Sequence, residues 1–297
     1  MIIDQLVFGS ARLTGGASSA GSKRLVRACL HGGITRFDTA PSYGLGTAEL
    51  VIGQSLGSDA AAQIATKVGS DRPSHPVART WLRAVKGLIR PGTSPLAVPL
   101  SPGAAVSEPV HHAFTPEQMA RSLEQSRRAL RRDTLDLLLL HDIAPSQVTP
   151  GVIDFMLRAR CDGLANEVGH ATGGLANHQL VERFPANFIV QAAASPEHLL
   201  GTTVKVHTSI LHSIARTAKY LEREDPIFAE RLGRIANLVP PDKADKISAR
   251  LAAAYVLVHV HNPECKLIFA TTHADRLEAF LRAINVLSAA KPNSLLR

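Results

Sequence analysis

Residues 37–53, which read FDTAPSYGLGTAELVIG, constrain the fold of this chain more than any other stretch. Residues 35–40 are expected to form a buried strand, and Pro41 ends it because proline has no backbone N–H to donate to a neighbouring strand. A turn with two glycines follows, and helical periodicity begins after Thr47, a residue type that often caps helix N-termini. The stretch therefore predicts a strand, a tight turn and a helix in direct succession.

Strands and helices are expected to alternate along the rest of the chain. Strand-like runs occupy residues 6–10, 35–40, 64–68, 134–141, 167–170, 188–192, 203–208 and 266–270. Helical patterns occupy residues 22–30, 48–56, 116–130, 175–184, 210–220, 226–237, 244–259 and 275–287. The leucine run at residues 137–140 lacks alternation, as expected for a parallel strand buried on both faces. Strand–helix units joined by right-handed crossovers predict an α/β fold, a (β/α)8 TIM barrel.

The length of the chain favours a single domain spanning residues 1–297. Single α/β barrels run to about 250 residues or more, and 45% of the residues are hydrophobic, enough for one large core. Residues 70–114 do not fit the alternation because they are rich in proline and glycine. We expect a long loop insertion here, leaving the third strand and overhanging the barrel mouth. Trp81, in this loop, either lines a substrate pocket or packs the loop onto the barrel.

Composition argues against several classes of partner. The formal net charge is +8 and the pI is about 9.8, but only 4% of residues are aromatic, which provides few platforms for stacking nucleic-acid bases. The densest basic cluster, Arg127, Arg128, Arg131 and Arg132, is interpreted as a solvated helix face. The three cysteines have no metal-binding or redox spacing, so no metal site is predicted. Without a signal peptide or a membrane-length apolar run, the chain is expected to be cytoplasmic and to bind neither nucleic acid nor membrane.

Three motifs carry a resemblance to the aldo-keto reductase family. The first is FDTAPSYG, with Glu49 and Gly53 following it; the second is TKVG at residues 66–69; the third runs D-x-x-x-x-H from Asp136 to His141. Each motif falls where a predicted strand ends, which is where β/α barrels carry their chemistry. The resemblance implies a catalytic tetrad made of Asp38, Tyr43, Lys67 and His141.

The residue types of this tetrad suit the reduction of a carbonyl group. The developing alkoxide needs a proton, and Tyr43 can supply it, although a free phenol has a pKa of about 10. Lys67 is predicted to lower that pKa by favouring the phenolate, and Asp38 to hold the lysine in place. His141 can donate to the carbonyl oxygen or share the proton of the tyrosine. Each residue alone could be structural, as a turn cap, a solvated lysine, a strand-end histidine or a packed tyrosine, but their order at successive strand ends favours the tetrad.

The resemblance further implies NADP or NAD as the cofactor. Positions that correspond to cofactor contacts in the family are Gly9, Ser10, Thr172, Gln191, His207, Thr271 and Arg276. Thr172 and Gln191 would hold the nicotinamide amide, and His207 would stack on its ring. Thr271 and Arg276 would meet the phosphates. Helix N-termini near the last two strands of such barrels commonly bind these groups.

Some positions depart from the family pattern. Ala171 stands where a hydroxyl-bearing residue is usual, Ala270 where many NADPH-dependent members have lysine, and residues 279–280 replace a Glu-Asn pair. The predicted function is a monomeric oxidoreductase that transfers a hydride between NAD(P)H and an aldehyde, ketone or sugar hemiacetal. The motifs TAPSYGLG and LLLLHD most resemble the branch with sugar and pyridoxal dehydrogenases. The alternative is a barrel that binds a nucleotide as a regulatory or partner-binding subunit with little turnover.

Overall fold

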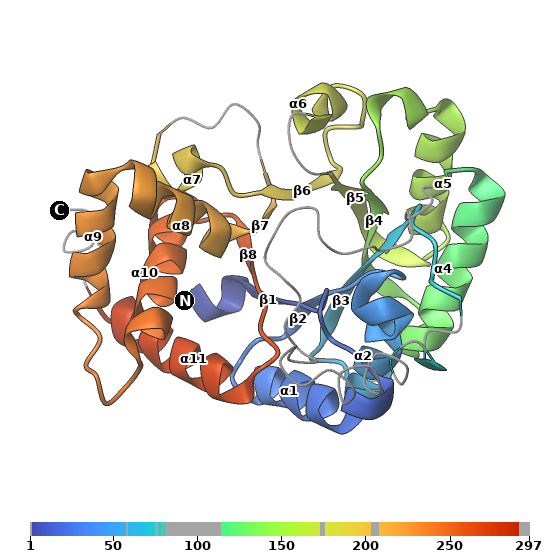
Figure 1. The fold of residues 1–297 in the computed structure, drawn as a ribbon. Helices are drawn as coiled ribbons and strands as arrows, with labels where there is room; N and C mark the ends of the chain where they lie inside the picture. The colour runs from blue at the N-terminus through green and yellow to red at the C-terminus, as the bar shows by residue number, and fades with distance from the viewer. Residues whose placement is uncertain are drawn as a thin grey trace.

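The computed structural model describes residues 2–57, 59–74, 77–78, 80, 114–172, 176–202 and 208–290. Within these residues, a closed barrel of parallel strands is surrounded by helices (Figure 1). Most of the predicted loop at residues 70–114, including Trp81, lies outside the described residues, and so does His207.

Eight strands close the barrel in chain order, each parallel to the next, and the last returns to pair with the first. They are β1 Leu6–Gly9, β2 Arg36–Asp38, β3 Gln63–Val68, β4 Leu135–His141, β5 Ala165–Ala171, β6 Ile189–Ala193, β7 Ile210–His212 and β8 Lys266–Phe269. This confirms the predicted (β/α)8 barrel. Because all strands run in one direction, their carboxyl ends meet at one rim.

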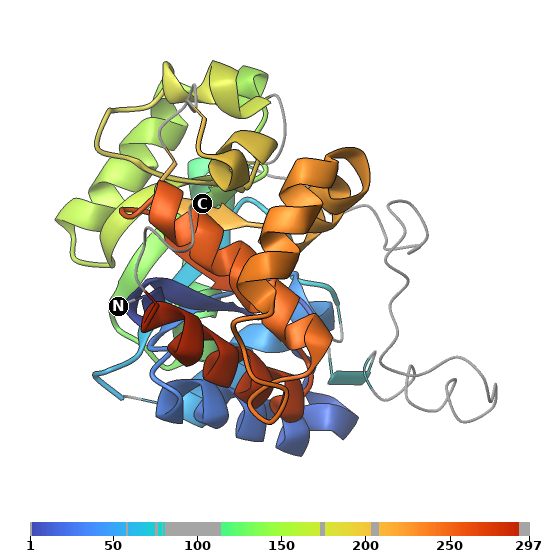
Figure 2. The same cartoon turned by 90° about the vertical axis from the view of Figure 1, so that its left-hand side faces the viewer.

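Helices cover the outside of the barrel. They are α1 Ser19–His31, α2 Ala48–Leu56, α4 Pro116–Leu130, α5 Pro150–Cys161, α6 Ala176–Val181, α7 Pro196–Leu200, α8 Ile214–Glu224, α9 Pro226–Ala236, α10 Lys246–His261 and α11 Ala274–Ser288. Figure 2 shows the orange and red helices α9, α10 and α11 packed side by side. Across the described ranges, no helix combines the length and the apolar character that a bilayer span requires.

The consecutive leucines of β4 alternate between two apolar layers. On β4, Leu137 and Leu139 face the barrel interior, whereas Leu138 and Leu140 pack under the helices. All four are buried, as predicted from the run without alternation. Full burial of a leucine contributes about 1.5–3 kcal/mol, so the four consecutive leucines stabilise β4 against both layers.

The seventh strand is not where the sequence predicted it. The prediction that residues 203–208 supply the seventh strand of the barrel is wrong, because β7 is Ile210–His212. Thr208 lies outside any strand, and residues 203–207 are not among those described. A barrel strand is buried on both faces, and β7 supplies Ile210 to the interior and Leu211 to the helix layer. An alternating segment supplies apolar side chains to one face only. The helix predicted from residue 210 consequently begins at Ile214.

Helix α5 was not predicted, although its start carries local signals. The Thr149 hydroxyl accepts a hydrogen bond from the Val152 N–H at 3.3 Å, and Pro150 occupies the first helical position. Both features are typical of helix N-termini because they suit backbone N–H groups that have no partner within the helix. The pair Thr149-Pro150 is thus a local sequence signal for the start of α5.

Candidate active site

The turn after β2 brings the loop tyrosine of the signature to the barrel rim. The segment Tyr43–Gly46 forms a 3-10 turn in which Gly44 has a φ of +57°. A Cβ on Gly44 would lie 1.9 Å from the carbonyl oxygen of Leu13, so the turn requires glycine. Thr47 stands at the N-cap position of α2, as predicted, but its hydroxyl does not cap the helix. Instead it donates to the Gly44 carbonyl oxygen at 2.6 Å and accepts from the Gly15 N–H at 2.7 Å.

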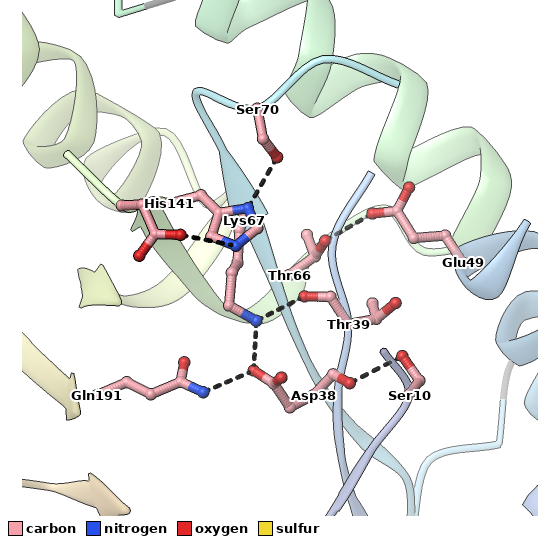
Figure 3. Close-up of polar contacts among 10 residues, drawn as sticks. Ser10, Asp38, Thr39, Glu49, Thr66, Lys67, Ser70, His141 and Gln191 are labelled. Carbon is pink, nitrogen blue, oxygen red and sulfur yellow. Dashed lines mark hydrogen bonds and ion pairs between the residues drawn. The ribbon is translucent and has the colours of Figure 1, made fainter. Parts of the chain in front are cut away.

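A buried ion pair joins the ends of β2 and β3 (Figure 3). Lys67 Nζ lies 2.7 Å from Asp38 Oδ1 and donates a second hydrogen bond to the Thr39 carbonyl oxygen at 2.9 Å. Lys67 is 1% exposed and Asp38 is 4% exposed. Burial acts to lower the pKa of Lys67, but Asp38 and Tyr43 raise it more strongly, so its pKa lies above the ordinary value and the ammonium remains charged.

The same ammonium lies against the ring of Tyr43, 4.7 Å from its centre. Burial raises the pKa of the Tyr43 phenol, the Lys67 charge acts to lower it, and the Asp38 charge acts to raise it. The predicted effect of Lys67 is therefore present, but burial outweighs it and the pKa lies above that of a free phenol. Tyr43 is consequently protonated at neutral pH, the state that a proton donor needs.

His141, the last residue of β4, lies beside Tyr43 and the buried ion pair. Its ring meets Tyr43 edge-on, with ring centres 5.7 Å apart and planes at 83°. Its Nδ1 lies 2.8 Å from the Ser70 hydroxyl oxygen, and its Nε2 lies 3.8 Å from Asp142 Oδ2. The tyrosine, the histidine and the buried ion pair thus gather at the carboxyl ends of β2, β3 and β4.

Gln191 and Thr172, beside this group, each have a buried polar atom without a hydrogen-bond partner among the described residues. Gln191 on β6 donates from Nε2 to Asp38 Oδ1 at 3.2 Å, but its Oε1 is unpaired. Thr172, directly after β5, has a buried and unpaired hydroxyl. Buried polar atoms are normally hydrogen bonded. This pair therefore suits a ligand that presents both a donor and an acceptor, such as a carboxamide.

The carboxyl end of β7 carries His212, which sequence reasoning missed because it placed the strand too early. Ile210 faces the barrel interior and Leu211 faces the helices. Side chains alternate along a strand, so His212 points inward, and the charges of the buried ion pair act on it. Burial lowers the pKa of His212. In the sequence, the apolar pair Ile210-Leu211 followed by the polar His212 indicates a short strand with a polar residue at its carboxyl end.

The predicted phosphate contacts lie after β8. The Thr271 hydroxyl accepts a hydrogen bond from the His273 N–H at 3.1 Å. Arg276 is exposed in the first turn of α11 and makes no ion pair within the described part of the chain. The N-terminus of a helix carries partial positive charge, so this exposed turn has the electrostatics that an anion requires.

Gly9 and Ser10, at the end of β1, already have packing roles. A Cβ on Gly9 would lie 2.7 Å from Ile268 Cγ2, which shows how closely β1 approaches β8. The Ser10 hydroxyl is buried and donates to the Asp38 carbonyl oxygen at 2.9 Å. Their contact with a cofactor stays a prediction.

Arg127 and Arg128 of the basic cluster lie on α4, whereas Arg131 and Arg132 follow its last residue, Leu130. Arg127 and Arg128 both pair with Glu124. Arg132 donates to two backbone carbonyl oxygens in the loop before β3. The interpretation as a helix face therefore holds for Arg127 and Arg128 only, because Arg132 lies beyond the helix and binds a loop.

His170, on the helix side of β5, should make the protein sensitive to acid. Its ring stacks on Phe184 with centres 5.0 Å apart, and neither of its nitrogens has a hydrogen-bond partner among the residues that the structure describes. Burial lowers the pKa of His170 to about 4, whereas an unfolded histidine titrates near 6.5. The folded state binds fewer protons, so stability present above pH 6.5 should be lost as the pH falls towards 4, by about 3 kcal/mol.

Urea unfolding at several pH values between 7 and 4 would measure this loss. His170→Phe, which keeps a ring against Phe184, should flatten the decline in unfolding free energy over that range. His31→Phe, at the exposed end of α1, should leave it unchanged. If the unfolding free energies of the wild type and His170→Phe declined in parallel with falling pH, His170 would not be the source of the acid sensitivity.

A closed parallel barrel with ionisable side chains at the carboxyl ends of its strands is the architecture of β/α-barrel enzymes. Comparison with known proteins identifies the family within this class of enzymes: the model of the Aldo/keto reductase family matches residues 5–196. The chain belongs to the aldo/keto reductase family, which uses NAD(P)H and acts on small carbonyl compounds. No curated protein matches the sequence.

Solved structures share the fold over nearly the whole chain. A glycerol dehydrogenase from Gluconobacter oxydans is 17% identical, with a TM-score of 0.62 over 94% of this chain and 86% of that chain. An aldo-keto reductase from Bacillus halodurans in its holo form is 17% identical, with a TM-score of 0.60 over 97% and 87%. An aldo/keto reductase from Klebsiella pneumoniae in complex with NADP and acetate is 18% identical, with a TM-score of 0.59 over 95% and 86%.

Proposed function

We propose that this chain catalyses reversible hydride transfer between NAD(P)H and an aldehyde, ketone or sugar hemiacetal. The observation that carries the proposal is the Lys67 ammonium, held by Asp38 at 2.7 Å and placed 4.7 Å from the ring centre of Tyr43. A barrel that only bound a nucleotide would not need a buried cation directed at a tyrosine. A buried cation beside a tyrosine stabilises the phenolate that forms when the tyrosine gives up its proton.

Each member of the tetrad has a part in the proposed reaction. Tyr43 donates its proton to the carbonyl oxygen, and the Lys67 ammonium stabilises the phenolate that remains. Asp38 keeps Lys67 charged and in position. An N–H of His141 donates to the same carbonyl oxygen and orients it. Bound NAD(P)H supplies the hydride.

The unpaired atoms near the tetrad support a nicotinamide site. The Gln191 Oε1 can accept from the carboxamide NH2 group, and the Thr172 hydroxyl can donate to its carbonyl oxygen. His212, which points inward from β7, would stack on the nicotinamide ring, and the role predicted for His207 stays a prediction because that residue is not among those described. Ala171 contributes no hydroxyl, so Thr172 and Gln191 would share the amide between them.

Arg276 would bind the 2′-phosphate that distinguishes NADPH from NADH. Arg276→Ala is expected to raise the Kd for NADPH by about 10- to 150-fold, because a hydrogen bond to a charged group contributes about 1.5–3 kcal/mol. The Kd for NADH should stay nearly unchanged. Isothermal titration calorimetry with both nucleotides measures this difference. Arg282→Ala, farther along α11, is the control. Equal weakening of both nucleotides would exclude a role in phosphate selection.

The resemblance of TAPSYGLG and LLLLHD leads us to extend the proposal to the branch with sugar and pyridoxal dehydrogenases. Calorimetric titration with NADPH and NADH is the first test of the whole proposal, followed by a screen of aldehydes, ketones and sugars in both directions. Binding and turnover would support it. Failure to bind either nucleotide would rule it out.

A further inference from the structure

Ser70 contacts His141 from outside the predicted tetrad. Its hydroxyl oxygen lies 2.8 Å from His141 Nδ1 (Figure 3). Ser70 is buried, so water does not compete freely for this hydrogen bond. The serine follows β3 by two residues, and the histidine ends β4. The contact therefore crosses between two neighbouring strand ends.

The backbone on the N-terminal side of Ser70 is held by a tight turn. Gly69 has a φ of +99°, in the left-handed region that favours glycine. A Cβ at this position would lie 2.1 Å from an atom of the Phe114 ring, so the turn packs directly against that side chain. The packing of this turn therefore limits how far the backbone next to Ser70 can move.

A buried carboxylate anchors the same segment on both sides. Glu49 of α2 is fully buried, accepts a hydrogen bond from the Thr66 hydroxyl at 2.5 Å and forms an ion pair with Arg72 (Figure 3 shows the threonine contact). Arg72 also donates to the Gly46 carbonyl oxygen at 3.0 Å. The residues flanking Lys67 and Ser70 are thus tied to one helix, and the serine has little freedom to leave the histidine.

We propose that Ser70 is a positioning residue that fixes the tautomer and orientation of His141. The inference rests on the proposed function. A carbonyl oxygen only accepts hydrogen bonds, so the imidazole nitrogen that meets it must carry a proton. A neutral imidazole has one N–H. If Nε2 carries it, Nδ1 must accept, and the Ser70 hydroxyl is the donor placed at 2.8 Å.

The side-chain nitrogens of His141 report this state directly. Long-range ¹H–¹⁵N correlation spectra of the wild type, with His141 assigned by its loss in His141→Gln, are expected to show a protonated Nε2 and a hydrogen-bonded, unprotonated Nδ1. Ser70→Ala should shift the His141 signals towards a mixture of tautomers. Ser122→Ala is the matched control, because Ser122 lines the same polar cavity as Ser70 on the α4 side.

Kinetics provide the second measurement. Ser70→Ala is expected to lower kcat by about tenfold, the effect of losing one hydrogen bond, while the Kd for NADPH stays within about twofold. Ser70→Cys keeps a side chain of similar size with a weaker hydrogen-bond donor. Its kcat should lie between those of the wild type and Ser70→Ala. Unchanged His141 signals in Ser70→Ala, or a wild-type His141 protonated at Nδ1, would overturn the inference. Absence of turnover in the wild type would count against the proposed function alone, because the spectra still decide the role of Ser70.

Discussion

Replacing Tyr43 with phenylalanine is expected to lower kcat by about a thousandfold, within the range typical of removing a general acid, and to leave nucleotide binding nearly unchanged. The ring remains to pack against His141, whose ring centre lies 5.7 Å away, so the variant removes the hydroxyl and little else. Steady-state kinetics on a carbonyl substrate and calorimetric titration with NADPH would separate the two effects.

Tyr220→Phe provides the matched control because this tyrosine is exposed on α8, away from the barrel rim. It should behave as the wild type in both measurements. Turnover that survived in the Tyr43 variant would show that another group supplies the proton. Nucleotide binding without turnover in the wild type itself would favour the alternative function, a regulatory or partner-binding barrel.

Replacing Lys67 with methionine is expected to abolish turnover and to destabilise the fold by about 3–5 kcal/mol, the usual effect of breaking a buried ion pair. The Asp38 carboxylate would remain buried after losing a cation at 2.7 Å, with Gln191 still donating to the same oxygen. Urea unfolding at pH 7 measures the stability, and the same preparation is assayed for activity.

A double variant separates the two consequences. Asp38→Asn combined with Lys67→Met removes both charges, so it should recover most of the lost stability without restoring turnover. Arg158→Met, which breaks the exposed pair with Asp154 on α5, should change stability little. If the double variant were no more stable than Lys67→Met alone, the ion pair would not be the reason for the instability.

Much of the fold and of the tetrad could be predicted because the signals are local. Helices α2 and α4 have the predicted bounds, since the residues that begin and end them are neighbours in sequence. The tetrad could be placed for a similar reason: each member falls in or just after a strand, and parallel strands bring their carboxyl ends to one rim. The order of the strands, together with the resemblance of the three motifs to the family, was sufficient to predict that these side chains would lie close together.

Other features depended on which segments pack together. The sequence alone determined a parallel barrel and predicted which side chains would lie at its rim, because period and residue type are properties of short stretches. Only the tertiary structure decided that β7 begins at Ile210, that His212 points inward, and that burial outweighs Lys67 in setting the pKa of Tyr43. It also decided the contact of Ser70 with His141. Burial, exact register and hydrogen bonds between distant residues arise from the summed packing of the whole barrel, which no local stretch encodes.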